Sequence, residues 1–350
     1  MTSIHDFAAI EQWRHGHRLE AQHVRSLRTA FYKKYAGPRE ALAALPKAVR
    51  DDFAARFEFH ALELSERFDS ARDGATKLLF RTAEHLLLES VVLRPASGRT
   101  ALCVSTQVGC AARCQFCATG KMGLARNLSA AEILDQIVQS GELAAREGRN
   151  VRSIVFMGMG EPFHNEEALH AALARLVDPR AFHFHPRRLL VSTVGIPRAM
   201  VRCARAWPQV RQAVSLHSAR DDVRRHLMPV AARHDLTELR EALAEVAALG
   251  QYDVMIEYLL LDGLTDTDDD VAALIEYLRG LRVHVNLIPF NPIAEAPPLR
   301  RSTPSRHAVV SESLKAAGFP VTTRYSLGAD IAAACGQLVR DAQPGAAVAP

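Results

Sequence analysis

Residues 101–117, ALCVSTQVGCAARCQFC, contain the pattern that decides the fold and the chemistry. Cys110, Cys114 and Cys117 are spaced x3 and x2, directly after a short apolar run over residues 102–108, and no fourth cysteine lies near enough in sequence to close a local metal site. A four-iron cluster takes four ligands, so three protein thiolates leave one position for water or a substrate. The pattern therefore predicts a reactive cluster rather than a structural one.

A structural zinc site is the alternative for these cysteines. Such sites are closed by four protein ligands, usually two ligand pairs a dozen or more residues apart. The sequence has no second Cys-x2-Cys and no downstream His-x3-His partner. The x3–x2 spacing is instead similar to that of the radical S-adenosylmethionine (SAM) superfamily, which implies that the methionine part of SAM chelates the open iron.

Composition indicates one large domain, or a large domain with a small appendage. The 350 residues are 48% hydrophobic and 23% charged, which fits a soluble protein with a sizeable core. No apolar run approaches the length of a membrane span and the first thirty residues lack a signal core, so we expect a cytoplasmic protein without a membrane partner. Six cysteines in such a chain favour metal or redox chemistry over a disulfide framework.

Residues 11–50 carry nine Lys or Arg against three Glu, with Trp13, Phe31, Tyr32 and Tyr35 among them. Basic residues interspersed with aromatics can bind phosphates and stack on bases. A solvated helical face explains the same segment equally well.

The pattern along the chain predicts an α/β fold. Residues 1–90 are expected to form a small helical accessory domain that could bind RNA, residues 91–340 the core with a C-terminal cysteine segment, and residues 341–350 a flexible tail. Six β-rich runs alternate with amphipathic helices, which predicts an open, partial (β/α)6 barrel. The runs cover residues 102–107, 153–157, 189–192, 212–216, 253–260 and 283–288. Ser129 to Glu132 forms a capping box that starts one of the helices.

Polar groups follow these strands, where barrel enzymes place their chemistry. Gly158 and Gly160 let the backbone approach a ligand, and Glu161 suits the ammonium of an amino-acid moiety. The other strand-end groups, able to bind a ribose or carboxylate, are Ser192, Ser215, His217 and Asn291.

Three more cysteines lie outside the triplet. Cys335, flanked by small residues near the C-terminus, is approachable enough for a nucleophile. Cys103 lies seven residues before the cluster motif, on the first strand of the core. Cys203 lies in a helical stretch, and we interpret it as a core residue.

Together these motifs resemble the RlmN/Cfr family of radical SAM adenine methyltransferases acting on 23S ribosomal RNA. The resemblance runs from about Glu89 to Leu338. It rests on the segments CVSTQVGC (103–110), FMGMGE (156–161), SLH (215–217) and AACGQL (333–338).

An adenine ring C–H carbon is electrophilic, so ordinary polar methyl transfer from SAM does not methylate it. The resemblance therefore implies a radical mechanism. By resemblance, Cys335 takes a methyl group from one SAM, and a second SAM at a [4Fe–4S] cluster supplies a 5′-deoxyadenosyl radical. Cys103 then releases the methylated base by forming a transient disulfide with Cys335, and Glu89 accepts the ring proton. The implied SAM contacts are Gly160, Glu161, Ser192, Ser215, Leu216, His217 and Asn291.

Two branches of this family methylate either C2 or C8. Residues 117–124, 186–195 and 227–229 resemble the Cfr branch, whereas Glu161-Pro162 is closer to the housekeeping form. The balance favours C8 and leaves C2 open. The electron donor, the oligomeric state and transfer RNA as a further substrate also stay open. Rival hypotheses are a different radical SAM enzyme and a non-catalytic RNA-binding protein with a structural metal.

Overall fold

A computed structural model describes residues 1–294 and 299–338, and the expected tail over residues 341–350 lies outside this part. Seven neighbouring strands are parallel in the described chain. They are β6 (Thr100–Cys103), β9 (Val151–Phe156), β10 (Leu189–Thr193), β11 (Arg211–Ser215), β12 (Val254–Leu260), β13 (Val283–Pro289) and β14 (Val321–Thr323). All six predicted runs are therefore parallel strands, and β14 is an additional one.

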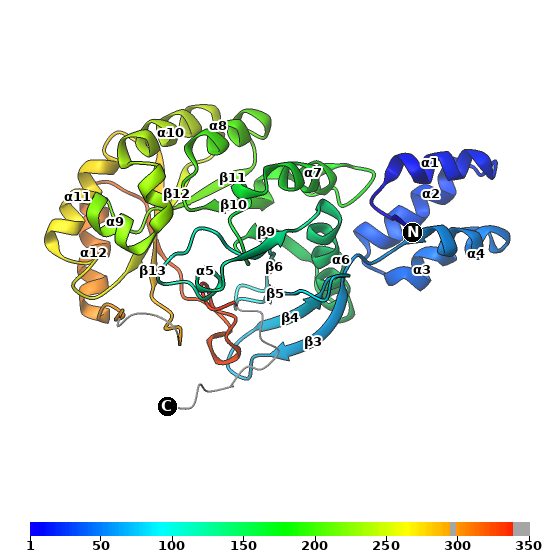
Figure 1. Cartoon of the computed structure of the whole chain (residues 1–350), viewed down its shortest axis with the longest axis horizontal. Coiled ribbons are helices and arrows are strands. Elements are labelled where there is room, and N and C mark those ends of the chain that lie inside the picture. The colour runs from blue at the N-terminus through cyan, green and yellow to red at the C-terminus, as the bar shows by residue number, and fades with distance from the viewer. Residues whose placement is uncertain (295–298, 339–350) are drawn as a thin grey trace.

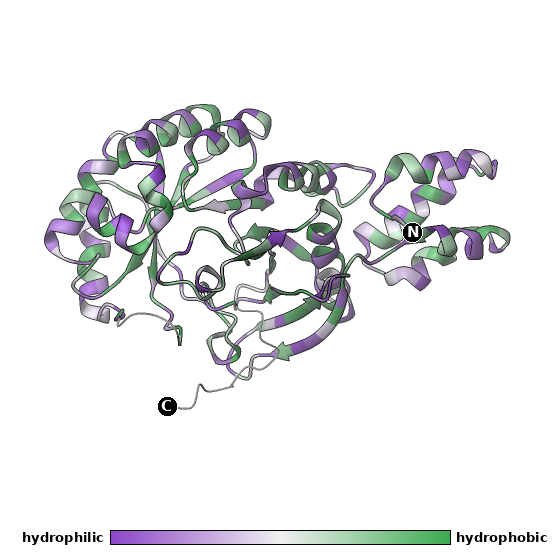
Figure 2. Ribbon diagram, viewed as in Figure 1, coloured by the Kyte–Doolittle hydropathy of each residue, from purple (hydrophilic) through white to green (hydrophobic). Residues whose placement is uncertain are grey.

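Amphipathic helices connect these strands and cover the outer side of the curved sheet (Figure 1). They are α6 (Ala130–Arg146), α7 (Glu166–Val177), α8 (Pro197–Ala206), α9 (Asp221–Leu227), α10 (Leu236–Leu249), α11 (Asp268–Leu278) and α12 (Pro304–Ala316). The outer helices carry both hydrophilic and hydrophobic residues (Figure 2). The alternation of parallel strands with helices along the chain confirms the expected partial barrel. No described helix has the length and apolar character needed to cross a membrane.

The predicted capping box begins α6. The Ser129 hydroxyl accepts a hydrogen bond from the Glu132 N–H at 3.2 Å, and the Glu132 carboxylate accepts one from the Ser129 N–H at 2.8 Å. Two N–H groups that a helix start would leave unpaired are thereby satisfied. The helix is then held in place by its buried apolar face, which includes Ile133 and Ile137.

The expectation that residues 1–90 are helical is wrong beyond Arg56. Helices α1 (Phe7–Gly16), α2 (Ala21–Arg28), α3 (Gly37–Ala43) and α4 (Lys47–Arg56) form a separate group (Figure 1). Strands β3 (Glu63–Asp69), β4 (Ala75–Arg81) and β5 (Leu87–Leu93) follow, and they extend the sheet antiparallel through β5 and β6. The sequence contains the signal for this, because Asp73-Gly74 is a turn dipeptide before an apolar run.

The aromatic residues of the basic segment belong to the core of the helical group. Trp13 is 5% exposed, and Phe31 and Tyr32 are fully buried. These three rings therefore cannot stack on bases, which overturns that part of the expectation. Several cations of the segment do reach solvent, and the exposed ones are Arg18, Arg25, Lys33, Lys34, Arg39 and Lys47.

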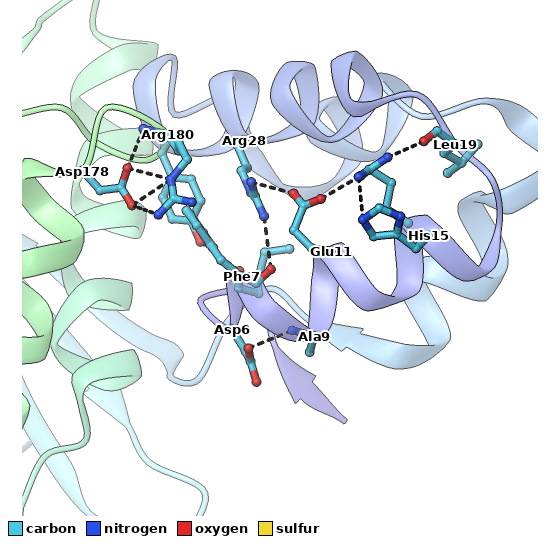
Figure 3. A network of polar contacts seen from close by, with 12 residues as sticks. Asp6, Phe7, Ala9, Glu11, His15, Leu19, Arg28, Asp178 and Arg180 are labelled. Atoms are coloured by element: carbon cyan, nitrogen blue, oxygen red, sulfur yellow. Dashed lines mark hydrogen bonds and ion pairs between the residues drawn. The ribbon is translucent and has the colours of Figure 1, made fainter.

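Cation–π and polar contacts fix the helical group to the barrel. The guanidinium of Arg175, on α7, lies 3.6 Å from the centre of the Phe7 ring, and that of Arg28 lies 3.9 Å from it. Arg28 also pairs with Glu11 at 3.1 Å (Figure 3). Arg175 donates to the carbonyl of His5 at 3.0 Å. Part of the positive charge is therefore used inside the protein rather than presented to a partner.

A buried ion pair joins β4 to β5. The Nζ atom of Lys77 lies 2.9 Å from Oε1 of Glu89, and the two side chains are 1% and 0% exposed. Taking two charges out of water is costly, and only their close approach offsets that cost. The pair therefore constrains the register of these two strands.

We expect Lys77→Met to lower the free energy of unfolding by about 3–5 kcal/mol, because it leaves the Glu89 carboxylate buried without its cation. Urea unfolding followed by circular dichroism measures the change. The double variant Lys77→Met/Glu89→Gln should recover most of the loss, and a single variant as stable as the parent would contradict the account.

Candidate active site

A cavity of about 430 Å³ opens at the carboxyl ends of the parallel strands. Barrel enzymes place their active sites at this edge. Most of the residues singled out from the sequence line it: Cys103, Cys110, Cys114, Cys117, Gly160, Glu161, Ser192, Ser215, His217, Asn291 and Cys335. Groups from distant parts of the chain thus share one chamber.

The cysteine loop is shaped by a close backbone contact. Gly109 has φ of +82°, and a Cβ there would lie 1.9 Å from the carbonyl oxygen of Gly123. That same oxygen accepts a hydrogen bond from the Cys110 N–H at 2.9 Å. Only glycine fits this position, because a side chain would push apart the two backbone segments that the hydrogen bond from Cys110 to Gly123 joins.

The three thiols of the loop lie in a largely water-free setting. Burial raises the pKa of Cys110 to about 12 and also raises the pKa values of Cys114 and Cys117. Among the described residues, no three His, Cys, Asp or Glu side chains are gathered closely enough to hold a single ion. Cluster thiolates bind different irons, so their sulfurs stand apart, and this donor set fits a [4Fe–4S] cluster.

The Gly158-to-Glu161 turn is packed against the first strand of the core and its continuation. Added Cβ atoms at Gly158 and Gly160 would lie 2.6 and 2.5 Å from Ser105 and Gln107. The two glycines therefore allow this turn to pack closely against another segment of the same chain. The Glu161 carboxylate accepts hydrogen bonds from the N–H groups of Phe163 and Val194 at 2.9 and 2.7 Å. Burial raises its pKa to about 7. Glu161 therefore connects this turn to the loop after β10.

His217 is held as a neutral ring at the end of β11. Its Nδ1 accepts a hydrogen bond from the Leu259 N–H at 3.1 Å, which assigns the proton to Nε2. Burial lowers its pKa to about 3. The ring meets Phe116 of the cysteine loop edge-on, with centroids 4.7 Å apart. The adjacent Leu216 is fully buried in the core and is not part of the cavity lining.

Hydrogen bonds from two directions fix the C-terminal cysteine segment over the cavity. The Ala118 N–H, one residue past the cysteine triplet, donates to Gly336 O at 2.7 Å, and Thr119 Oγ1 donates to Leu338 O at 2.7 Å. From the other side, the Asn291 amide donates to Cys335 O at 3.1 Å. Asn291 therefore positions this segment.

Cys335 and Cys103 are free thiols that face the same cavity. Cys335 is exposed within the cavity, yet the surrounding protein atoms exclude bulk water and raise its pKa to about 12. The nearby Glu257 carboxylate also raises the pKa of Cys335, and Cys103 adds to the effect. Burial raises the pKa of Cys103 to about 11. Cys203, by contrast, is fully buried on α8, as expected.

Glu89 is not among the residues that line the cavity. It lies on β5, two positions before Val91, which does line the cavity and pairs with Cys103 in the sheet. Residues two apart on a strand share a face, so Glu89 lies beside the chamber on the same side of the sheet. Its role as a proton acceptor stays a prediction.

The sequence analysis missed two charged residues of the cavity wall, Glu257 and Arg324. Arg324 Nη1 lies 3.9 Å from Glu257 Oε1 and donates to the sulfur of Met157 at 3.1 Å. One signal could have revealed Glu257, since a lone carboxylate interrupts the apolar run over residues 254–260. A buried charge in a strand that is covered on both faces calls for a partner.

Comparisons with known proteins agree with this geometry. The model of the radical SAM superfamily matches residues 104–278. A probable RNA methyltransferase of Rhodopirellula baltica is 46% identical over 331 residues, covering 95% of this chain and 86% of the relative. A probable dual-specificity RNA methyltransferase RlmN of Thermus thermophilus is 40% identical over 308 residues, covering 88% and 86%. The crystal structure of a radical SAM methyltransferase from Sphaerobacter thermophilus has a TM-score of 0.92 at 38% identity, covering 97% and 100%.

The fold and the cavity are thus those of a radical SAM protein. Within that superfamily, the chain belongs to the RlmN/Cfr family of RNA methyltransferases. The cysteine loop would hold the cluster, and the strand ends from β9 to β13 would surround SAM.

We expect Gly109→Ala to reduce the iron content of the anaerobically reconstituted protein to less than half, because its Cβ would clash with Gly123 and displace the backbone that leads directly into Cys110. Iron and sulfide per chain measure this. Gly98→Ala is the matched control, since Gly98 also has a positive φ but nothing lies within 4 Å of an added Cβ. Equal iron content in the two variants would contradict the role given to Gly109.

Proposed function

We propose that this protein methylates a ring carbon, C8 or C2, of an adenine in 23S ribosomal RNA through a methyl group carried on Cys335. One observation supports this above all: Cys335 and Cys103 meet in the chamber of the cluster cysteines. A radical enzyme that modified a small molecule would not require a pair of additional thiols there. The RNA methyltransferase names of the relatives support RNA as the substrate.

When bound, the cluster and one SAM molecule would supply a radical, and a second SAM molecule in each turnover would supply the methyl group. The thiolate of Cys335 acts as the methyl acceptor, and its accessibility inside the cavity suits that role. The methyl carbon on Cys335 becomes bound to the adenine ring, which ties the RNA to the protein. Cys103 acts second: its thiolate can attack the Cys335 sulfur, the bond between that sulfur and the former methyl carbon breaks, and the carbon takes up a proton as the disulfide forms and the methylated base is freed. An external electron donor then returns both cysteines to thiols.

The chain excludes water from this chemistry. Apolar groups, among them Phe156, Leu259 and Phe290, share the cavity wall with the thiols. A cavity of about 430 Å³ is too small to admit an RNA duplex. The target adenine must therefore be unstacked before it enters. Glu89, on the same sheet face as Val91, is the proposed acceptor of the ring proton.

Two cysteine variants test the scheme with 23S ribosomal RNA fragments under anaerobic conditions. Cys335→Ala should carry no protein-bound methyl group and form no product, because the methyl acceptor is missing. Cys103→Ala should instead accumulate an RNA–protein adduct, since nothing releases the base from Cys335. Mass spectrometry of the protein and base-resolved analysis of the RNA give both results.

Cys203→Ala is the matched control, because Cys203 is a buried thiol on α8 that is not part of the cavity lining. Normal turnover by Cys103→Ala would disprove the two-cysteine scheme. The same product analysis identifies the ring position: 8-methyladenosine supports the Cfr-like branch, and 2-methyladenosine alone supports the housekeeping branch.

A further inference from the structure

Tyr325 lies at the opening of the cavity, and the proposed chemistry does not use it. The residue belongs to the cavity lining, yet it is 70% exposed. The other exposed large hydrophobic residues of the described chain are all outside that lining, and they are Met1, Leu64, Leu124, Leu249 and Val309. Tyr325 therefore differs from them, because its apolar ring borders the chamber and is also open to solvent.

The backbone is fixed on both sides of Tyr325. The Arg324 N–H donates to the carbonyl of Leu287 at 2.9 Å. On the other side, the Asn291 side-chain amide donates to the Ser326 hydroxyl at 3.0 Å. Because both neighbours are held, the ring occupies a defined place before any ligand arrives, which lowers the entropy cost of binding.

The same amide connects Tyr325 to the cysteine that is proposed to carry the methyl group. The Asn291 side-chain nitrogen also donates to the carbonyl of Cys335 at 3.1 Å. Arg324 turns inward, where its guanidinium lies 3.9 Å from Oε1 of Glu257. Tyr325, the next residue, stays at the outer edge of the same chamber. An adenine that reaches Cys335 therefore has this ring beside it at the entrance.

Unstacking the target adenine leaves a neighbouring base of the RNA without its stacking partner. The cavity, of about 430 Å³, is too small for a duplex, so the flanking nucleotides stay outside it. An aromatic side chain at the entrance can replace the lost stacking, and it can do so for any base because every base has a π-face. A tyrosine ring offers this contact at little cost in side-chain entropy.

We propose that Tyr325 is a stacking platform for the nucleobase next to the target adenine in the RNA chain. The inference rests on the proposed function, in which the chamber receives an adenine of RNA. It makes Tyr325 a positioning residue for the substrate, separate from the thiol chemistry of Cys335 and Cys103. Because the ring recognises a flat base and not a particular sequence, it contributes affinity rather than sequence selectivity.

Binding of 23S ribosomal RNA fragments that carry 2-aminopurine on either side of the target adenosine tests the proposal. The fluorescence of 2-aminopurine rises when the base loses its stacking partners. In the complex with the parent protein the probe should stay quenched at one flanking position, and with Tyr325→Ala it should become bright there. Tyr325→Ala should also bind the fragment about tenfold more weakly, within the range for one lost stacking contact. Tyr325→Leu should behave in the same way, because its side chain has no flat face.

Tyr325→Phe and Tyr325→Trp keep an aromatic face, so both should retain the quenching and bind within about threefold of the parent. Val309→Ala is the matched control, because Val309 is an exposed apolar residue on α12 outside the cavity lining. Iron content and thermal midpoint show that each variant is folded. A quenched probe with Tyr325→Ala, or full affinity of Tyr325→Leu, would overturn this inference alone. A parent protein that methylates no adenosine of the fragment would overturn the proposed function as well.

Discussion

The site depends on the parallel register of strand β6 and strands β9 to β13. Because neighbouring parallel strands end at the same edge of the sheet, residues more than a hundred positions apart in the sequence lie in one chamber. The pairings of Val191 with Gln212 and of Val214 with Ile256 are typical of this register. A shift of one residue in β10, β11 or β12 would turn Ser192, Ser215 or Glu257, respectively, away from the cavity.

Burial dominates the electrostatics of this chamber. The thiols, the Glu161 carboxyl and the His217 ring all have pKa values displaced toward their neutral forms, and desolvation is the largest cause in each case. The cost of removing a charged group from water is offset only where the group accepts hydrogen bonds or forms an ion pair. Glu161 is supported by two backbone N–H groups, and Glu257 by two serines. The wall is therefore kept nearly neutral, which suits chemistry that must exclude water.

The sequence was sufficient for the elements that local patterns specify. The capping box at Ser129, the six parallel strands and the cysteine loop all follow from short-range signals, and the structure confirms the strands and the cap. Strands β3 and β4 and the first part of β5 lie within residues 1–90, for which the sequence analysis predicts helices. Their pairing partners are one another and β6, and a local sequence pattern does not reveal such partners. Periodicity within a short apolar run does not separate the two states.

Side-chain partners were harder to predict than elements. The aromatics at positions 13, 31 and 32 could have faced RNA or a core, and only tertiary packing decides for the core. Nothing in the local sequence marks Lys77 and Glu89 as an ion pair, and their burial depends on strands that the sequence analysis did not predict. Glu257 and Arg324 were missed because their meaning comes from neighbours in space.

The fastening of Cys335 to the loop after Cys117 has a consequence for biosynthesis. Chains fold from the N-terminus as they leave the ribosome, and the barrel strands precede the last wall of the chamber. The hydrogen bonds from Ala118 and Thr119 to Gly336 and Leu338 can form only after the latter two residues have been synthesised, and both follow every barrel strand in the chain. The barrel strands are therefore complete before this wall of the chamber can close.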